Sequence, residues 1–370
     1  MRYIYDQPDW PVFRWDKAVL ANELAALRYR QGRFLSRMEA LGFELRSLAV
    51  LQTLTDDVLK TSEIEGEVLD RRQIRSSLAR RLGMDAAGLP PADRHVDGIV
   101  DMLLDATRNF AQPLTAERLF AWHAALFPTG RSALKRITVG GWRRAEGGPM
   151  QVVSEDRPGR QIVHFQAPGA DRVDAEMRRF LTWFENEAVE IDPVIKAAVA
   201  HIWFVTIHPF DDGNGRIGRA IIDLVLARAE GTSQRFYSMS ARLRVERNSY
   251  YETLEAAQKG DLDITLRLRW FMRVLDGALD DAETRMDAVL RRATFWGNSA
   301  VDGVNDRQRK ILNRLLDGFE GKFTSSKYAK MAPCSQDTAL RDIDDLMARG
   351  LLAREAAGGR STSYALLVAV

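Results

Sequence analysis

The stretch His208-Pro-Phe-Asp-Asp-Gly-Asn-Gly-Arg-Ile-Gly-Arg219 lies between two helical patterns and is the most informative part of this sequence. Gly213 and Gly215 permit positive φ and a close approach, so successive backbone N–H groups can converge on a phosphate. A helix that begins near Arg216 adds its unpaired amides and the positive end of its dipole. The stretch therefore has the chemistry of an anion-binding site.

The charged side chains of this stretch suit a magnesium-bound polyphosphate. Arg216 and Arg219 are three residues apart, so both guanidinium groups project from the first helical turn toward the same ligand. Asp212 offers a hard oxygen ligand where Mg²⁺ could bridge phosphates. His208 titrates near neutral pH and is a candidate general base for an incoming hydroxyl. Each residue alone is more often structural, but their complementary roles in one short stretch favour a functional site.

Composition excludes several classes of protein. The chain has 370 residues, of which 46% are hydrophobic, and its 53 Lys and Arg residues nearly balance 51 Asp and Glu residues. This is the composition of a globular protein and excludes both a disordered chain and one that coats nucleic acid along its whole length. Cys334 is the single cysteine, so no intrachain disulfide can form. Because no apolar run reaches about 18 residues, we expect a cytoplasmic protein without a membrane partner.

Helical periodicity dominates the chain and predicts a mainly α fold. A Gly- and Pro-rich segment at 83–93 is expected to link an N-terminal helical domain, 1–83, to a central domain, 94–295. Two β-prone runs, 150–153 and 160–165, predict a β-hairpin in the central domain. Helices are expected at 15–41, 48–66, 97–109, 115–126, 171–187, 193–207, 216–229, 247–258 and 264–291.

The C-terminal region, 303–370, has the pattern of a winged helix-turn-helix domain. Three amphipathic helices, at 306–317, 325–331 and 335–350, precede two strands, 351–355 and 363–368, around a Gly-rich tip. If this domain binds DNA, the groove-facing candidates are Gln336, Thr338 and Arg341, with Arg360 on the wing. The same helix carries four acids that would repel phosphates, so a protein-interaction or dimerisation role is an equal alternative. These acids are Asp337, Asp342, Asp344 and Asp345.

The stretch 208–219 resembles the HPFx(D/E)GNGRxxR motif of Fic-domain proteins at every defining position. The resemblance implies the mostly helical Fic fold and the transfer of AMP from ATP to a Ser, Thr or Tyr hydroxyl of a protein. The intact Gly213-Asn-Gly215 favours AMP transfer over the phosphoryl transfer of Doc-like relatives. By resemblance, His208 deprotonates the acceptor and Asp212 holds Mg²⁺. The α- and β-phosphates are cradled by Asn214 and by the amides of Gly213 and Gly215. The polyphosphate is bound by Arg216 and Arg219, and Phe210 anchors the loop.

A second motif, Thr61-Ser-Glu-Ile-Glu65-Gly66, resembles the inhibitory (S/T)xxxE(G/N) helix of autoinhibited Fic proteins. Carboxylates at the end of a helix oppose its dipole, and Gly66 is expected to terminate the helix in the left-handed conformation. The resemblance implies that Glu65 pairs with Arg219 and blocks the γ-phosphate site. It also implies that the hairpin at 150–165 is a flap that aligns a target peptide by strand addition; the alternative is a hairpin that only covers the core.

Three functions stay open at this point. The first is an autoinhibited protein AMP-transferase with ATP and Mg²⁺ as cofactors and a protein hydroxyl as acceptor. The second is a DNA-binding regulator whose Fic domain senses nucleotide. The third is the removal of AMP from a modified protein, with Glu65 positioning water. The acceptor can be the chain itself, and a homodimer is compatible with the sequence.

Overall fold

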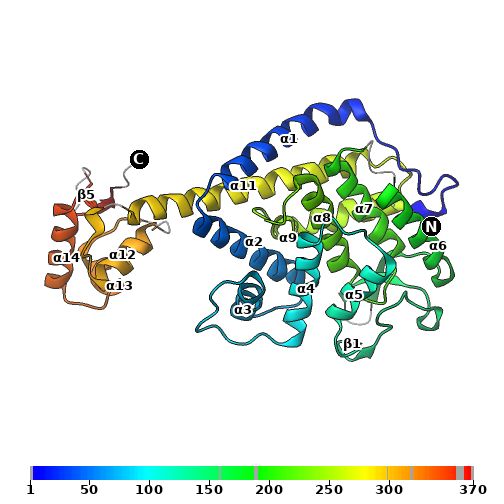
Figure 1. Cartoon of the computed structure of the whole chain (residues 1–370), viewed down its shortest axis with the longest axis horizontal. Coiled ribbons are helices and arrows are strands. Elements are labelled where there is room, and N and C mark those ends of the chain that lie inside the picture. The colour runs from blue at the N-terminus through cyan, green and yellow to red at the C-terminus, as the bar shows by residue number, and fades with distance from the viewer. Residues whose placement is uncertain are drawn as a thin grey trace. The chain divides into compact units, whose positions relative to one another are not determined.

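The computed structural model describes residues 3–157, 160–186, 191–297, 299–316, 319, 321–355 and 362–367. The chain divides into two compact units, Met1–Ala282 and Glu283–Val370. Helices dominate both units, which confirms the predicted mainly α class (Figure 1). None of the helices in the described ranges is both long and apolar enough to cross a lipid bilayer.

The first unit contains most of the helices of the chain. Residues 83–93, expected as a linker, are irregular, but the helices on both sides of them belong to this same unit. Its helices are α1 (Lys17–Glu39), α2 (Phe43–Ile64), α3 (Arg71–Leu82), α4 (Arg94–Arg108), α5 (Ala116–Leu126), α6 (Ala170–Asn186), α7 (Pro193–Ile207), α8 (Asn214–Glu230), α9 (Met239–Val245), α10 (Arg247–Lys259) and α11 (Thr265–Trp296), the last of which continues into the second unit.

Helices α7 and α8 form the centre of the first unit. Asp192 caps α7 by accepting a bond from the backbone of Val194, and every residue of the helix from Val194 to Ile207 is buried. A helix that is apolar on all sides must lie inside the protein. The loop 208–213 then reverses the chain into α8, which is buried over most of its length. The motif loop is therefore held between two core helices.

The N-terminal helices pack against this core. Helix α1 runs beside α11 (Figure 1), where Arg30 contacts Asp276 at 2.8 Å and Arg269 contacts Glu23 at 3.0 Å.

Helix α2 begins earlier than expected, and helix α3 was not predicted. Ile74, Leu78 and Leu82 of α3 are spaced four residues apart, so helical periodicity is present there, although the arginines of this helix outnumber its large apolar residues.

Three two-stranded sheets complete the described residues. Strands β3 (Gln151–Arg157) and β4 (Arg160–Gln166) pair antiparallel, with Val152 opposite Phe165, and form the predicted hairpin; its tip, 158–159, lies outside the described residues. A short hairpin, β1 (Arg131–Ser132) with β2 (Lys135–Arg136), was not predicted.

The second unit has its own hydrophobic core. Helices α12 (Asp306–Leu316), α13 (Ser325–Met331) and α14 (Gln336–Ala348) are followed by the antiparallel strands β5 (Leu352–Arg354) and β6 (Tyr364–Leu366). This order of elements is the one expected from the sequence. The tip between the strands, with Arg360, lies outside the described residues. The core includes Ile311, Leu312, Phe323, Tyr328, Ile343 and Leu346.

Candidate functional site

His208 stands at the junction between α7 and the motif loop. It adopts the left-handed conformation, with φ at 52°, and its backbone N–H donates to the carbonyl of Phe204. Its ring atom Nδ1 lies 3.1 Å from the carbonyl of Val205. A carbonyl can only accept, so Nδ1 carries the proton and Nε2 keeps a lone pair. Burial lowers the pKa of His208, and the neutral ring is the form that can act as a base.

The motif loop is anchored to the core through Phe210 and Asn214. The ring of Phe210 is fully buried and stacks on His123 with 4.2 Å between centroids. The Asn214 side chain accepts from the Phe210 amide at 3.0 Å and donates to the Phe210 carbonyl at 2.8 Å. Both ends of this side-chain amide are thus engaged by the loop itself. In this structure the Asn214 side chain shapes the loop, and its contact with phosphate stays a prediction.

Arg143, which the sequence does not single out, clamps the same loop from another segment. Its backbone amide donates to the Pro209 carbonyl at 2.8 Å, and its guanidinium Nε donates to the His208 carbonyl at 2.7 Å. Nη2 donates to the carbonyl of Pro168. Burial lowers the pKa of this arginine. A side chain 65 positions from its partner leaves no local pattern that could have identified it.

The N-terminus of α8 forms the expected amide cradle. Gly213 has φ at 81°, and a Cβ atom there would lie 2.9 Å from the ring of Phe127. A Cβ atom on Gly215 would lie 2.2 Å from Oε1 of Glu65. Both positions therefore require glycine for a close approach. The Gly213 amide donates to Asp212, so the remaining amides at the start of α8 and the helix dipole would favour an anion beside Gly215, where the Glu65 carboxylate lies.

The same carboxylate holds Arg219. Nη2 of Arg219 donates to Oε1 of Glu65 at 2.7 Å and to the carbonyl of Thr61 at 3.0 Å, while Nε donates to the Thr61 hydroxyl at 2.7 Å. Gly66, with φ at 84°, lies in the turn that follows α2. Burial of Arg219 is the largest single effect and opposes its charge, but Glu65 together with Tyr250 and Tyr251 outweighs it and raises the pKa of the guanidinium. The structure thus brings Thr61, Glu65 and Arg219 together.

Arg216 has a different carboxylate partner, Glu67, which was not predicted. Nη1 of Arg216 donates to Oε2 of Glu67 at 3.2 Å, and the guanidinium lies over the ring of Phe127 at 5.1 Å. Nη2 lies 3.9 Å from Oδ1 of Asp212. Glu67 also contacts His95 on α4. In the sequence, Glu67 is one more acidic residue after a glycine, so nothing local distinguishes it.

Asp212 is placed to hold a magnesium ion together with a bound polyphosphate. Its carboxylate accepts from the hydroxyl of Ser132 and from the Gly213 amide, and each carboxylate oxygen has a further lone pair. The described residues contain no group of three or more His, Cys, Asp or Glu residues suited to a metal. This fits Mg²⁺, which often takes one or two protein carboxylates and completes its shell with phosphate oxygens and water.

The two arginines also fit a polyphosphate. Nη1 of Arg219 and Nε of Arg216 are buried and have no hydrogen-bond partner in the described part of the chain. Such donors are costly to leave unpaired. Phosphoryl oxygens are suitable acceptors for guanidinium groups, so the loop, the cradle and both arginines form one consistent site for an anionic ligand.

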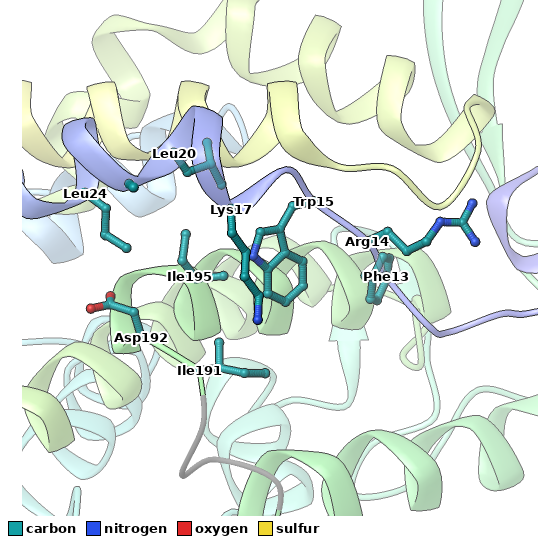
Figure 2. A pocket seen from close by; sticks show the side chains of 10 residues that line it. Phe13, Arg14, Trp15, Lys17, Leu20, Leu24, Ile191, Asp192 and Ile195 are labelled. Carbon is teal, nitrogen blue, oxygen red and sulfur yellow. The ribbon is translucent and has the colours of Figure 1, made fainter.

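A separate cavity lies away from the motif loop. It has a volume of about 680 Å³ and is lined by residues of the N-terminal segment and residues around the start of α7. Trp15 and Lys17 lie opposite Ile191 and Ile195 there (Figure 2). No motif residue lines this cavity, so it is not the phosphate site.

Comparison with known proteins adds the family. Residues 113–226 match the Fic/DOC family, and residues 3–84 match a domain of unknown function, DUF4172. The chain is 27% identical over 209 residues to a protein adenylyltransferase Fic of Drosophila yakuba, which covers 54% of this chain and 36% of that protein. It is 32% identical over 102 residues to a protein adenylyltransferase of Caenorhabditis elegans, covering 27% of this chain. The chain thus spans well under two thirds of the length of these relatives.

Solved structures share the fold. A Fic family protein of Desulfovibrio desulfuricans aligns over 98% of both chains with a TM-score of 0.55 and 20% identity. A Fic-domain signalling protein of Bacteroides thetaiotaomicron aligns over 70% of this chain with a TM-score of 0.51 and 18% identity. The matched residues include the motif loop, and residues 113–226 of this chain form a Fic/DOC-family domain.

Proposed function

We propose that this protein transfers AMP from MgATP to a hydroxyl group of a protein. The observation that carries the proposal is the motif loop, in which His208 keeps a lone pair on Nε2 and the helix that follows carries two buried arginines with unpaired donors. The printed names of the relatives, protein adenylyltransferases, support the same reaction.

The reaction requires one proton transfer and one displacement. The acceptor hydroxyl loses its proton to Nε2 of His208 as its oxygen attacks the α-phosphorus of ATP. The bond from the α-phosphorus to the bridging oxygen breaks, and pyrophosphate leaves. Arg216, Arg219 and the amides at the start of α8 stabilise charge on the phosphates. Magnesium held by Asp212 would neutralise further negative charge.

We also propose that Glu65 restrains this activity. Its carboxylate occupies the cradle beside Gly215 and pairs with Arg219. The γ-phosphate of ATP would compete with it for the same guanidinium. Productive binding of ATP therefore requires Glu65 to leave Arg219, which costs the energy of a charge-assisted hydrogen bond.

The experiment uses the full chain with the substitution Glu65→Gly and ATP labelled on the α-phosphate, with Mg²⁺. We expect the protein to label itself with AMP, detected as the added mass of one AMP, and the double variant Glu65→Gly/His208→Ala to remain unlabelled. Absence of labelling on the chain and on proteins of a cell lysate would refute AMP transfer. Release of AMP from a labelled protein by the wild type, lost in Glu65→Gly, would instead assign the removal reaction.

A second candidate function is DNA binding through α14 in the second unit. The sequence objection was repulsion by four acids on this helix, but two of them are neutralised within the unit. Asp342 accepts from Arg307 at 3.0 Å and from Tyr328 at 2.9 Å, and Asp345 pairs with Arg349 at 2.8 Å. We expect salt-sensitive binding of a DNA duplex that weakens in Arg341→Ala; binding equal in wild type and variant would refute this role for α14.

A further inference from the structure

Glu67 lies two residues after Glu65 in the turn between α2 and α3, yet its surroundings differ. Oε1 of Glu67 contacts Nε2 of His95, and its other oxygen accepts from Arg216 at 3.2 Å. The second ring nitrogen of His95, Nδ1, lies 3.2 Å from the carbonyl of Leu126 on α5. Glu67 is thus tied to α4 and, through His95, to α5.

The contacts of His95 define its protonation state. Nδ1 faces a backbone carbonyl and Nε2 faces a carboxylate, and both of these groups accept hydrogen bonds. Both ring nitrogens must then carry protons, so His95 is an imidazolium ion. The hydrogen bond to Glu67 raises the pKa of His95, and the hydrogen bond to His95 lowers the pKa of Glu67. Both shifts agree with the charged pair.

The charge balance separates the two arginines. Glu65 and Arg219 together carry no net charge, whereas His95, Glu67 and Arg216 together carry one positive charge. The positions differ as well. The Glu65 carboxylate would collide with a Cβ atom on Gly215, while Glu67 is absent from the closest contacts of either motif glycine among the described residues. Glu67 therefore leaves both the cradle and the net charge of Arg216 available to an anion.

We propose that Glu67, held by His95, is a positioning residue that orients Arg216 for a phosphate group of the nucleotide. The inference rests on the proposed function in that it takes the motif loop as the ATP site. The guanidinium lies between the ring of Phe127 and the Glu67 carboxylate, which fixes its plane before the ligand arrives. Preorganised donors of this kind strengthen binding because less side-chain freedom is lost.

Two substitutions at one position test the proposal in the Glu65→Gly background, where the competing carboxylate is gone. Glu67→Ala removes the support of Arg216, and we expect MgATP affinity, measured by calorimetry, to fall about tenfold. Glu67→Gln can still accept from Arg216 while its NH₂ group donates to a neutral His95. Because the net charge of the three groups then stays at one positive, we expect Glu67→Gln to bind within about threefold of the parent.

A matched control comes from the same region. Glu63, at the end of α2, pairs with Lys60 at 2.8 Å and lies 3.4 Å from Arg244, and neither partner belongs to the motif loop. Glu63→Ala should leave MgATP affinity unchanged. Thermal unfolding of every variant identifies any general loss of structure. Where AMP transfer is measurable, a positioning role also predicts that KM for ATP rises in Glu67→Ala with kcat nearly unchanged.

Three outcomes would overturn the proposal: tighter MgATP binding in Glu67→Ala, which would make Glu67 a second inhibitor; unchanged binding; or equal losses in Glu67→Gln and Glu67→Ala. Binding is measured apart from chemistry, so the proposed function is tested separately. If MgATP binds with the expected pattern but no AMP transfer occurs, AMP transfer fails and the role of Glu67 stands.

Discussion

Arg216 and Arg219 lie one turn apart at the start of α8, and the turn after α2 provides each with a carboxylate. Both guanidinium groups are buried, at 5% and 2% exposure. Arg219 is engaged by Glu65 and Thr61 at distances of 2.7 to 3.0 Å, with the carboxylate inside the amide cradle. Arg216 rests on Phe127 and is held from outside the cradle by Glu67.

The comparison teaches that an arginine–carboxylate pair has no fixed function. The sign of its effect on ligand binding depends on where the carboxylate lies and on what balances its charge. Glu65 occupies the ligand position and cancels the charge of Arg219, so its removal should help an anion bind. Glu67 lies beside the position and shares its charge with His95, so its removal should hinder binding.

The largest expected effect concerns His208, which is proposed to act in the chemical step, whereas the two arginines are proposed to act in nucleotide binding. His208→Ala in the Glu65→Gly background should lower AMP transfer by about 10²- to 10⁴-fold, because a general base contributes a factor of this size. MgATP affinity should remain unchanged, since His208 forms no hydrogen bond with either arginine in the part of the chain that the structure describes. Label transfer and calorimetry check the two statements, and a parallel loss of affinity would show that His208 also shapes the nucleotide site.

The next effect is the release of Arg219. Glu65→Gly should raise MgATP affinity by about 10- to 100-fold, the range that corresponds to a hydrogen bond between charged groups. Thr61→Ala is the companion variant: it removes a hydroxyl contact but leaves the carboxylate in place, so its gain should be smaller. Calorimetry decides the order. Equal gains for Glu65→Gly and Glu67→Ala would remove the distinction between the two arginines.

The sequence was sufficient for the features that depend on neighbouring residues. The turn at Gly213, the helix starting at the motif and the termination after Glu65 follow from local backbone preferences. The mainly α class follows from helical periodicity. Asn214 lies within the motif, yet the sequence alone does not predict what its side-chain amide contacts. The observed contact with the Phe210 backbone depends on the folded path of the loop.

Contacts between distant segments could not be predicted in this way. Arg143 reaches His208 from 65 positions away, and Glu67 reaches Arg216 from 149 positions away. The composition around each is ordinary for a charged surface. Their roles arise from burial and from the atoms opposite them, which only the packing of the helices defines.

A substitution of Arg143 tests the support of the His208 base without changing the nucleotide site. Arg143→Met removes the guanidinium that donates to the carbonyls of His208 and Pro168, and we expect kcat of the Glu65→Gly protein to fall about tenfold, as for the loss of one charged hydrogen bond. KM for ATP should change little, because Arg143 forms no hydrogen bond with either motif arginine within the described ranges. The kinetic pKa of His208 should rise, since burial and then the Arg143 charge hold it low.

Two results would sharpen or break this assignment of Arg143. Arg143→Lys keeps the charge but not the fork of donors, so partial recovery of kcat is expected. A rise in KM without a fall in kcat would instead mean that Arg143 acts in nucleotide binding. The base and the two arginines would then not be separable by mutation.

The smallest expected effect concerns pH and distinguishes Glu67 from its glutamine variant. The pKa of His95 is raised, so its contribution to stability is complete below its unfolded pKa, about 6.5, and is lost as pH rises through the folded value. The pKa of Glu67 is lowered, so its contribution is complete above about 4.3 and is lost as pH falls through the folded value. The pair should therefore stabilise the protein most between about pH 4.3 and 6.5.

This effect is measured as the difference in thermal unfolding between wild type and Glu67→Gln across pH. Because both side chains are about one third exposed, at 32% and 34%, solvent screening limits the contribution to below about 1 kcal/mol. The difference should be largest between about pH 4.3 and 6.5 and shrink as pH rises through the raised pKa of His95, where the imidazolium loses its proton. A difference that is constant with pH would mean that His95 is neutral in the wild type, and Arg216 and Arg219 would then be balanced by their carboxylates in the same way.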